Sequence, residues 1–439
     1  SLQPGGLLAL EALLLGLVTP DEVYAEVVTG FPVILLLIFM VAGIYFLKDL
    51  LLFAFARLLL GVRSETLLAL LFCGAGAVLS AFLDALTVLA VVITVAVGFY
   101  GVYHRHASRE VEQALAAGDE AEDADVRAEH RDDLRRFRAF LAGLLMHAAV
   151  GTMLGGVTTM VGEPQNLLVA KEAGWDFGTF FVKMAPVTLP VLAVGLLTCL
   201  VVQRLRLFGY GEPLPRAVRE VLEATVAREN ANATPEYRQT LIVQGVVAVL
   251  LLLGLALHVA EVGILGLMVI VLATAFTGIV EEHRLGKAFE SALPFTALLV
   301  VFFVIVGEIH HQHLFDPVVE WVLTLDGRAQ ALAFYFANGA LSAISDNVFV
   351  ASIYISEIEQ ALREGLITRE QFDRLAIAVN TGTNIPSIAT PNGQAAFLFL
   401  LTSAVAPLVR LSYGKMCWMA LPYLVTTTTT GALASHWWL

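Results

Sequence analysis

Long apolar runs, repeated along almost the whole chain, limit the folds that this sequence can adopt. A helix that spans the hydrocarbon core of a bilayer needs about 20 mainly apolar residues. Hydrophobic residues make up 58% of the 439 residues and charged residues only 15%, and the mean hydropathy is +0.78. A soluble fold could not bury so much apolar surface, so we predict an all-α membrane protein. The runs lie at 5–19, 31–60, 67–103, 139–170, 177–203, 240–260, 262–280, 290–309, 329–355, 375–409 and 416–437.

The sequence also limits the chemistry of the chain. Its cysteines, Cys73, Cys199 and Cys417, all lie inside apolar runs, so we expect thiols rather than disulfide bridges. The zinc-site spacings CxxC and HExxH do not occur in the sequence. We expect no cofactor, no nucleic-acid partner and no enzymatic activity. The sequence alone does not exclude Ser80 as a nucleophile with His147 as its base.

Two charged stretches, 104–138 and 204–239, are too polar to enter lipid and are expected to be solvated. Both are rich in arginine, and they flank the two predicted crossings 139–170 and 177–203, which puts them on one side of the membrane. The positive-inside rule assigns that side to the cytoplasm.

Two apolar runs, 67–103 and 329–355, have lengths that suit neither one full crossing nor two. Two half-height helices that meet at a polar tip fit both runs better, so we predict a re-entrant helical hairpin in each. Small and polar residues stand near the middle of the two runs: Gly74, Gly76, Ser80 and Asp84 in the first, and Ser342, Ser345, Asp346 and Asn347 in the second.

The two hairpins belong to an apparent internal repeat. Counting crossings from 204–239, the first hairpin enters from the cytoplasm and the second from outside, so the two repeats have inverted topology. Paired, interrupted segments in inverted repeats indicate a secondary transporter with its site at the membrane midplane. Two sets of residues match, with number differences of 262 and 231 respectively: Ser80 and Asp84 with Ser342 and Asp346, then Gly151-Thr152, Thr159 and Gly162 with Gly382-Thr383, Thr390 and Gly393.

The repeat predicts the domain organisation. We assign 1–203 to the first inverted repeat, with its cytoplasmic loop at 104–138, and 240–439 to the second, joined by a cytoplasmic linker at 204–239. The helix at 240–260 has no counterpart in the first half, so we expect at least one helix before residue 1.

Asp84 and Asp346 are the residues that point most directly to function. A charged side chain at the membrane centre costs about 2.5–3.5 kcal/mol, and intramembrane acids usually serve transport. Capping of a half-helix is the alternative role, because Asp is a favoured N-cap residue. The two roles are compatible in a broken helix.

The segments 151–166 and 380–394 are predicted to break their helices, because both contain glycine and proline. Freed carbonyls, with Ser, Thr and Asn oxygens and a carboxylate, would form an all-oxygen site that suits a hard cation such as Na⁺. The alternative is a kinked helix whose freed backbone groups form hydrogen bonds with neighbouring helices and water. The predicted ion-binding and proton-coupling residues are Asp84, Asp346, Ser80, Thr152, Glu163, Ser342, Asn347, Asn380, Thr383 and Asn384.

Other polar residues are weaker candidates for a functional role. A group near 308–316, with His310, His311 and His313, has the chemistry of a metal site or a pH sensor, but a solvated helix end is the favoured interpretation. Lys48-Asp49 is interpreted either as a water-facing kink or as a relay. Lys183 and His147 are candidates for a proton path, with snorkelling as the alternative for the lysine.

Three sequence runs resemble NhaB-type sodium/proton antiporters, and the likeness covers almost the whole chain. They are GGVTTMVGEPQNL at 155–167, SAISDNVFV at 342–350, and NTGTN at 380–384 followed by TPNGQAAF at 390–397. The resemblance implies a multi-pass protein of the bacterial inner membrane that exports Na⁺, with Li⁺ as a second candidate ion, in exchange for protons and serves pH homeostasis. It also implies a homodimer, a transport domain on a scaffold, and kinship with dicarboxylate carriers and arsenite permeases.

Two other transport modes are alternatives to an antiporter. A sodium-coupled anion symporter of the dicarboxylate type would need a basic or hydroxyl-rich pocket, whereas the predicted tips carry acids and neither Lys nor Arg. A channel does not agree with broken inverted repeats, which imply alternating access. We therefore predict a secondary transporter in which Na⁺ and H⁺ compete for midplane carboxylates.

Overall fold

The structure is a computed structural model that describes 2–29, 31–83, 85–107, 130–231, 234–257, 259–290, 327–345 and 347–439, with scattered residues between 291 and 326. Several residues singled out by the sequence lie outside the described residues: Asp84, Asp346, His310, His311, His313 and most of 104–138. Predictions about them stay predictions.

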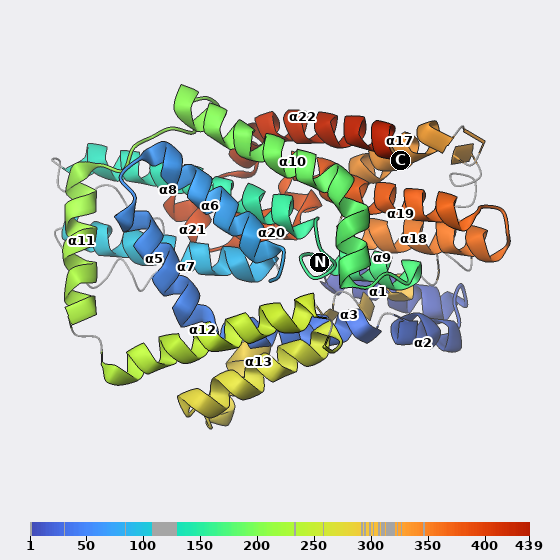
Figure 1. Ribbon diagram of the computed structural model, residues 1–439, viewed down its shortest axis with the longest axis horizontal. Coiled ribbons are helices and arrows are strands. Elements are labelled where there is room, and N and C mark those ends of the chain that lie inside the picture. Colours follow the sequence, from blue (N-terminus) through green and yellow to red (C-terminus); the bar gives the residue numbers. More distant parts are fainter. Residues whose placement is uncertain are drawn as a thin grey trace.

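The described part of the chain is helical, with no strand in it, as Figure 1 shows. The predicted all-α membrane architecture is therefore confirmed. Short apolar helices stand beside the long ones, including α6 (Glu65–Ser80) and α13 (Val262–Thr277). Among the described residues, four single helices are long and apolar enough to cross a membrane: α7 (Ala85–Ala107), α8 (Arg131–Gly156), α10 (Phe177–Leu205) and α12 (Pro235–Ala256).

The apolar run at 31–60 is bent. Its segments Ile38–Tyr45 and Lys48–Gly61 meet at 59°. Gln244 of α12 satisfies polar groups at the bend, since its Oε1 accepts from the Leu50 N–H at 2.7 Å and its Nε2 donates to Asp49 Oδ2 at 3.2 Å. These bonds favour a structural kink over a relay. The helices of this region are α1 (Leu2–Leu15), α2 (Pro20–Thr29), α3 (Phe31–Leu35), the π-helical turn η1 (Leu36–Met40), α4 (Val41–Tyr45) and α5 (Lys48–Gly61).

Two groups of helices can be followed in Figure 1. α12 and α13 lie along the lower edge, where α13 packs against η1 and α4. α10 and α22 (Tyr413–Trp438) lie side by side along the upper edge. Between these groups, α6 and α8 extend from the left toward the middle, and α18 (Asn347–Arg363) and α19 (Arg369–Asn384) extend toward it from the right. The remaining described helices are α9 (Pro164–Ala173), α11 (Arg216–Ala231), α14 (Glu282–Glu290), α17 (Gly327–Ile344), α20 (Ala395–Thr402) and α21 (Val405–Leu408).

The helices are interrupted at both predicted hairpin tips. α6 ends at Ser80 and α7 begins at Ala85, while α17 ends at Ile344 and α18 begins at Asn347. Single helices through these positions are thereby excluded. The inverted orientation of the two halves, the domain boundaries and the cytoplasmic side stay predictions.

Both predicted helix breaks are present, but they lie later in 151–166 and 380–394 than Gly151-Thr152 and Gly382-Thr383. α8 continues to Gly156 and α19 continues to Asn384, and each helix is interrupted only after its last residue. Both glycines are helical, and a neighbouring helix packs against each of them too closely for a side chain. α9 then begins after the first break, and two 3₁₀ turns, η3 (Pro386–Ala389) and η4 (Pro391–Gly393), precede α20 after the second.

Candidate functional site

Each predicted hairpin packs its first helix closely against a broken helix. A Cβ atom on Gly151 of α8 would lie 2.1 Å from the carbonyl oxygen of Cys73 on α6. A Cβ atom on Gly382 of α19 would lie 2.6 Å from the carbonyl oxygen of Tyr335 on α17. Gly151 and Gly382 differ by 231 in number, and Cys73 and Tyr335 by 262, as in the sequence repeat.

A hydrogen bond from a threonine side chain connects each hairpin tip to the segment that follows the broken helix. Thr159 Oγ1 donates to the carbonyl oxygen of Ala81, and Thr390 Oγ1 donates to the carbonyl oxygen of Ala343 at 2.5 Å. These four residues again match with the differences 231 and 262. The described ends of both hairpins therefore contact the broken helices, as predicted.

In the first half, Ser80 and Glu163 both approach Gly156, at the end of α8. The position of a Cβ atom on Gly156 is 3.1 Å from Ser80 Oγ and 3.1 Å from Glu163 Cγ. Ser80 is fully buried, and its Oγ has no hydrogen-bond partner among the described residues. Thr152, which we expected beside Ser80, lies one turn earlier in α8 and donates to the Ala149 carbonyl at 2.8 Å.

In the second half, Ser342 joins the hairpin to the end of α19. Its Oγ donates to the carbonyl oxygen of Thr383 at 3.0 Å, and both residues are fully buried. Thr383 Oγ1 donates within its own helix, to the carbonyl oxygen of Val379 at 2.9 Å. Asn347 begins α18 with both amide atoms buried and without a partner in the described structure.

Amide side chains connect the two halves. Gln165 Nε2 donates to Asn384 Oδ1 at 2.8 Å, and Asn384 Nδ2 donates to Asn166 Oδ1 at 3.1 Å. Asn166 Nδ2 also donates to the carbonyl oxygens of Gly156 and Thr159, both at 2.7 Å. The end of α19 is thus bonded directly to the start of α9, across more than 200 residues of sequence.

Asn380 lies one turn before Asn384 in α19. Its carbonyl oxygen accepts from Asn384 Nδ2 at 2.7 Å, and its Nδ2 contacts Met184 Sδ at 3.7 Å. The Oδ1 atom of Asn380 is buried and has no hydrogen-bond partner within the described ranges. We call the connected polar region the junction, and it consists of Ser80, Glu163, Gln165, Asn166, Ser342, Asn380, Thr383 and Asn384.

The junction is chemically suited to a hard cation. Its members are all buried, and most are neutral oxygen-bearing side chains, the ligand type that Na⁺ accepts. Neither Lys nor Arg is a member. A buried polar atom without a partner costs free energy, so the Ser80 and Asn380 oxygens are positions where a bound ion would supply the missing interaction.

Gln165 and Asn166 were not among the predicted site residues. The available signal was their place directly after Glu163-Pro164, where a helix begins again after a break. The partner of both side chains, Asn384, belongs to the other half, and such a tertiary pairing cannot be read from one sequence.

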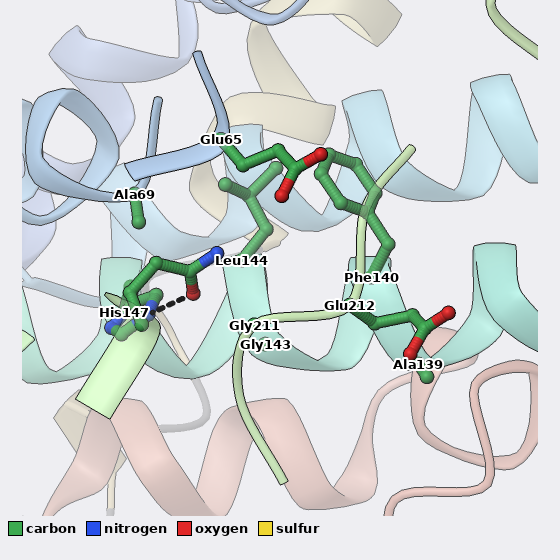
Figure 2. Close-up of a pocket in the computed structure, with 10 residues that line it drawn as sticks. Glu65, Ala69, Ala139, Phe140, Gly143, Leu144, His147, Gly211 and Glu212 are labelled. Carbon is green, nitrogen blue, oxygen red and sulfur yellow. Dashed lines mark hydrogen bonds between the residues drawn. The ribbon is translucent and has the colours of Figure 1, made fainter. Parts of the chain in front are cut away.

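A second polar cluster surrounds His147, in the middle part of α8. His147 Nδ1 lies 2.7 Å from the Tyr423 hydroxyl, and Nε2 lies 3.2 Å from Gln203 Oε1. Figure 2 shows this histidine at one end of a pocket that Glu65 and Glu212 also line. His147 precedes Gly156 by nine residues, or about 13 Å of helix, which separates it from Ser80 and from the junction.

One further prediction on side chains outside the junction has an outcome. All three cysteines are free thiols, as predicted. Lys183 Nζ forms an ion pair with Asp373 Oδ2 of α19 at 2.7 Å; its place in a proton path and the snorkelling alternative both stay predictions.

Solved structures show which class of protein has this fold. The YdaH transporter of Alcanivorax borkumensis superposes with a TM-score of 0.51 at 14% identity, covering 95% of this chain and 87% of that one. MtrF of Neisseria gonorrhoeae, titled as one of a class of antimetabolite efflux pumps, superposes with a TM-score of 0.52 at 14% identity, covering 98% and 84%. The fold is that of multi-pass helical membrane transporters.

The chain belongs to the bacterial Na⁺/H⁺ antiporter B (NhaB) family, whose family model matches residues 1–439. The Na⁺/H⁺ antiporter NhaB of Pseudomonas entomophila is 61% identical over 438 residues, which is 100% of this chain and 87% of the relative. The protein of the same name from Alcanivorax borkumensis is 61% identical over 430 residues, 98% and 81% of the two chains. The resemblance noted from the sequence is confirmed.

Proposed function

We propose that this chain exports Na⁺ from the cytoplasm in exchange for protons across a bacterial inner membrane. The observation that carries the proposal is the junction, where buried oxygens from two broken helices and two hairpins converge. Membership of the antiporter family and the names of its relatives support the same exchange. A sodium-coupled anion symporter has no comparable support, since no member of the junction is cationic.

The exchange depends on carboxylates that hold either ion but not both. Asp84 and Asp346 follow Ser80 and Ser342 by four residues in the sequence, and Glu163 lies at the junction itself. Burial disfavours an ionised carboxylate, whereas a bound cation favours it. Na⁺ binding therefore expels a proton and protonation expels Na⁺, and linkage makes the two effects equal.

Alternating access of the junction to the two sides completes the proposed cycle. On the cytoplasmic side, Na⁺ displaces protons; on the outer side, protons from outside displace Na⁺, and the proton gradient drives the cycle. The proposed inverted repeats supply the two-fold character that such a motion needs, because equivalent helices can exchange their roles in the two states.

The surroundings proposed for this chain are lipid and a second copy of itself. α12 carries exposed apolar side chains at helical spacing, Ile242, Val246, Val249 and Leu253, with 50–69% of each accessible. A face of this kind suits hydrocarbon. The homodimer rests on the family resemblance alone.

Proton flux in proteoliposomes tests the function directly. A sodium gradient imposed on vesicles that contain the purified chain, in a buffer free of organic anions, is expected to move protons in the opposite direction. Asp84→Asn and Asp346→Asn mimic the protonated state and should abolish exchange, whereas Asp132→Asn, at a half-exposed surface acid, should not. Wild-type rates in both Asp84→Asn and Asp346→Asn would refute the carboxylate mechanism; sodium uptake that requires an organic anion would favour the symporter.

A further inference from the structure

Glu163 and Gln394 occupy equivalent places in the two halves. Each directly follows a glycine, Gly162 or Gly393, and their numbers differ by 231 like the other matched pairs. Both have extended backbones, with φ and ψ of −144° and 143° for Glu163 and −129° and 122° for Gln394. Each is the N-cap residue of the helix that resumes after a break, α9 or α20.

The glycines before them make the same approach to the two hairpins. A Cβ atom on Gly162 would lie 2.6 Å from the carbonyl oxygen of Ser80, and a Cβ atom on Gly393 would lie 2.6 Å from that of Ser342. The two serines are themselves the matched residues of the hairpin tips. Each N-cap residue therefore directly follows a glycine that makes the same close approach to its hairpin.

The two side chains also contact equivalent positions. Glu163 Oε1 lies 3.3 Å from the Cβ position of Gly156. Gln394 Nε2 donates to Ser387 Oγ at 2.9 Å, and Ser387 stands in the second half where Gly156 stands in the first. Both side chains are buried, with 2% of Glu163 and none of Gln394 accessible.

The two sites differ in charge and hardly in shape. A glutamine amide is neutral at every pH, whereas a glutamate of nearly the same volume holds a proton or a cation. We propose that Glu163 carries a proton in the exchange cycle, so that the site of the first half releases one more proton on sodium binding than the site of the second. This inference rests on the proposed exchange function.

The surroundings of Glu163 allow both of its states. Its place at the N-terminus of α9 favours the ionised form, and burial favours the protonated one. The described junction side chains near this N-terminus are uncharged, namely Ser80 of α6, Gln165 and Asn166 of α9, and Asn384 of α19. The charged residues of α9 itself, Lys171 and Glu172, lie about two turns further along, and Asp84 and Asp346 lie outside the described residues.

Proton release on sodium binding tests the inference without transport. The purified protein in detergent micelles, in weakly buffered solution with a pH dye, receives saturating sodium chloride, with choline chloride as the ionic-strength control. Glu163→Gln should release about one proton fewer per chain than the wild type, and Gln394→Glu about one more, because the slope of linkage counts the protons exchanged. Glu370→Gln, at an 85% exposed acid, is the matched control and should equal the wild type.

The outcomes separate the inference from the function. No proton release by the wild type would contradict the exchange function itself. Wild-type release with an equal release by Glu163→Gln would overturn the assignment of Glu163. If Glu163→Gln no longer binds sodium, Gln394→Glu decides: one extra proton supports the unequal sites, and an unchanged number overturns them.

Discussion

Replacement of Gly155 by alanine tests how the hairpin is positioned beside the broken helix. A Cβ atom at this position would lie 1.8 Å from the carbonyl oxygen of Ala77 and 2.4 Å from its carbonyl carbon. Ordinary contact begins at about 3.5 Å, so α6 and α8 would have to separate by roughly 1.5 Å. Overpacking against side chains costs about 1–3 kcal/mol, and a rigid backbone places this change at the upper end.

The assay is thermal unfolding in detergent combined with sodium-driven proton flux. Gly155→Ala should unfold a few degrees below the wild type, and its exchange rate should fall, because Ser80 and Gly156 would be moved apart. Gly74→Ala is the matched control on α6, since a Cβ atom there meets nothing within 4 Å. It should leave the exchange rate unchanged and the unfolding temperature unchanged or slightly higher, because alanine has a higher helix propensity than glycine.

A Gly155→Ala variant with the stability and exchange rate of the wild type would refute the close packing of α6 on α8. An equal loss in Gly74→Ala would refute it as well. The effect would then belong to the hairpin in general rather than to this contact.

Two further substitutions address contacts within and beside the junction. Asn384→Ala removes the acceptor of Gln165 and the donor to Asn166, so we expect about 2–3 kcal/mol of lost stability and much slower exchange, measured by denaturant unfolding and proton flux; wild-type values would contradict the bridge between the halves. Thr390→Val removes the bond to the Ala343 carbonyl and should cost about 1–2 kcal/mol in the same unfolding assay. Its control is Thr402→Val, at an exposed threonine that bonds within its own helix, which should cost under about 0.5 kcal/mol; equal costs would contradict the threonine tie.

The helix ends at the hairpin tips could be predicted because length and polarity are local properties of the sequence. The 67–103 run is too long for one helix, and its polar residues gather near Ser80, where α6 ends. The same reasoning placed the end of α17 beside Ser345. The matched spacing of Thr159 and Thr390 also anticipated equivalent contacts, because repeated folds place repeated residues alike.

The helix break after α8 was misplaced because glycine has two opposite uses. Gly151 and Gly155 permit close approach of α6, and the helix continues through both of them. The α8 helix ends only at Gly156, before the turn that leads to Pro164. One sequence does not reveal which glycines face a neighbouring backbone, since that depends on tertiary packing.

The junction could be predicted only in part, because some of its contacts depend on tertiary packing. Ser342 and Thr383 come together as expected, because each belongs to a segment marked by its own polar residues. The bonds of Gln165 and Asn166 to Asn384 link the two halves and leave no periodic signal in either half. The surroundings of Asp84 and Asp346 stay a prediction.

The competition of Na⁺ and H⁺ for the same carboxylates is the central claim, and the pH dependence of sodium affinity tests it most directly. Radioactive sodium uptake into proteoliposomes is measured at a series of pH values, with the apparent KM determined at each. If one proton competes with each Na⁺, the apparent KM for sodium should rise about tenfold for each unit by which the pH falls below the carboxyl pKa. The maximal rate should stay constant. An apparent KM that is independent of pH over the whole range in which exchange occurs would contradict the account.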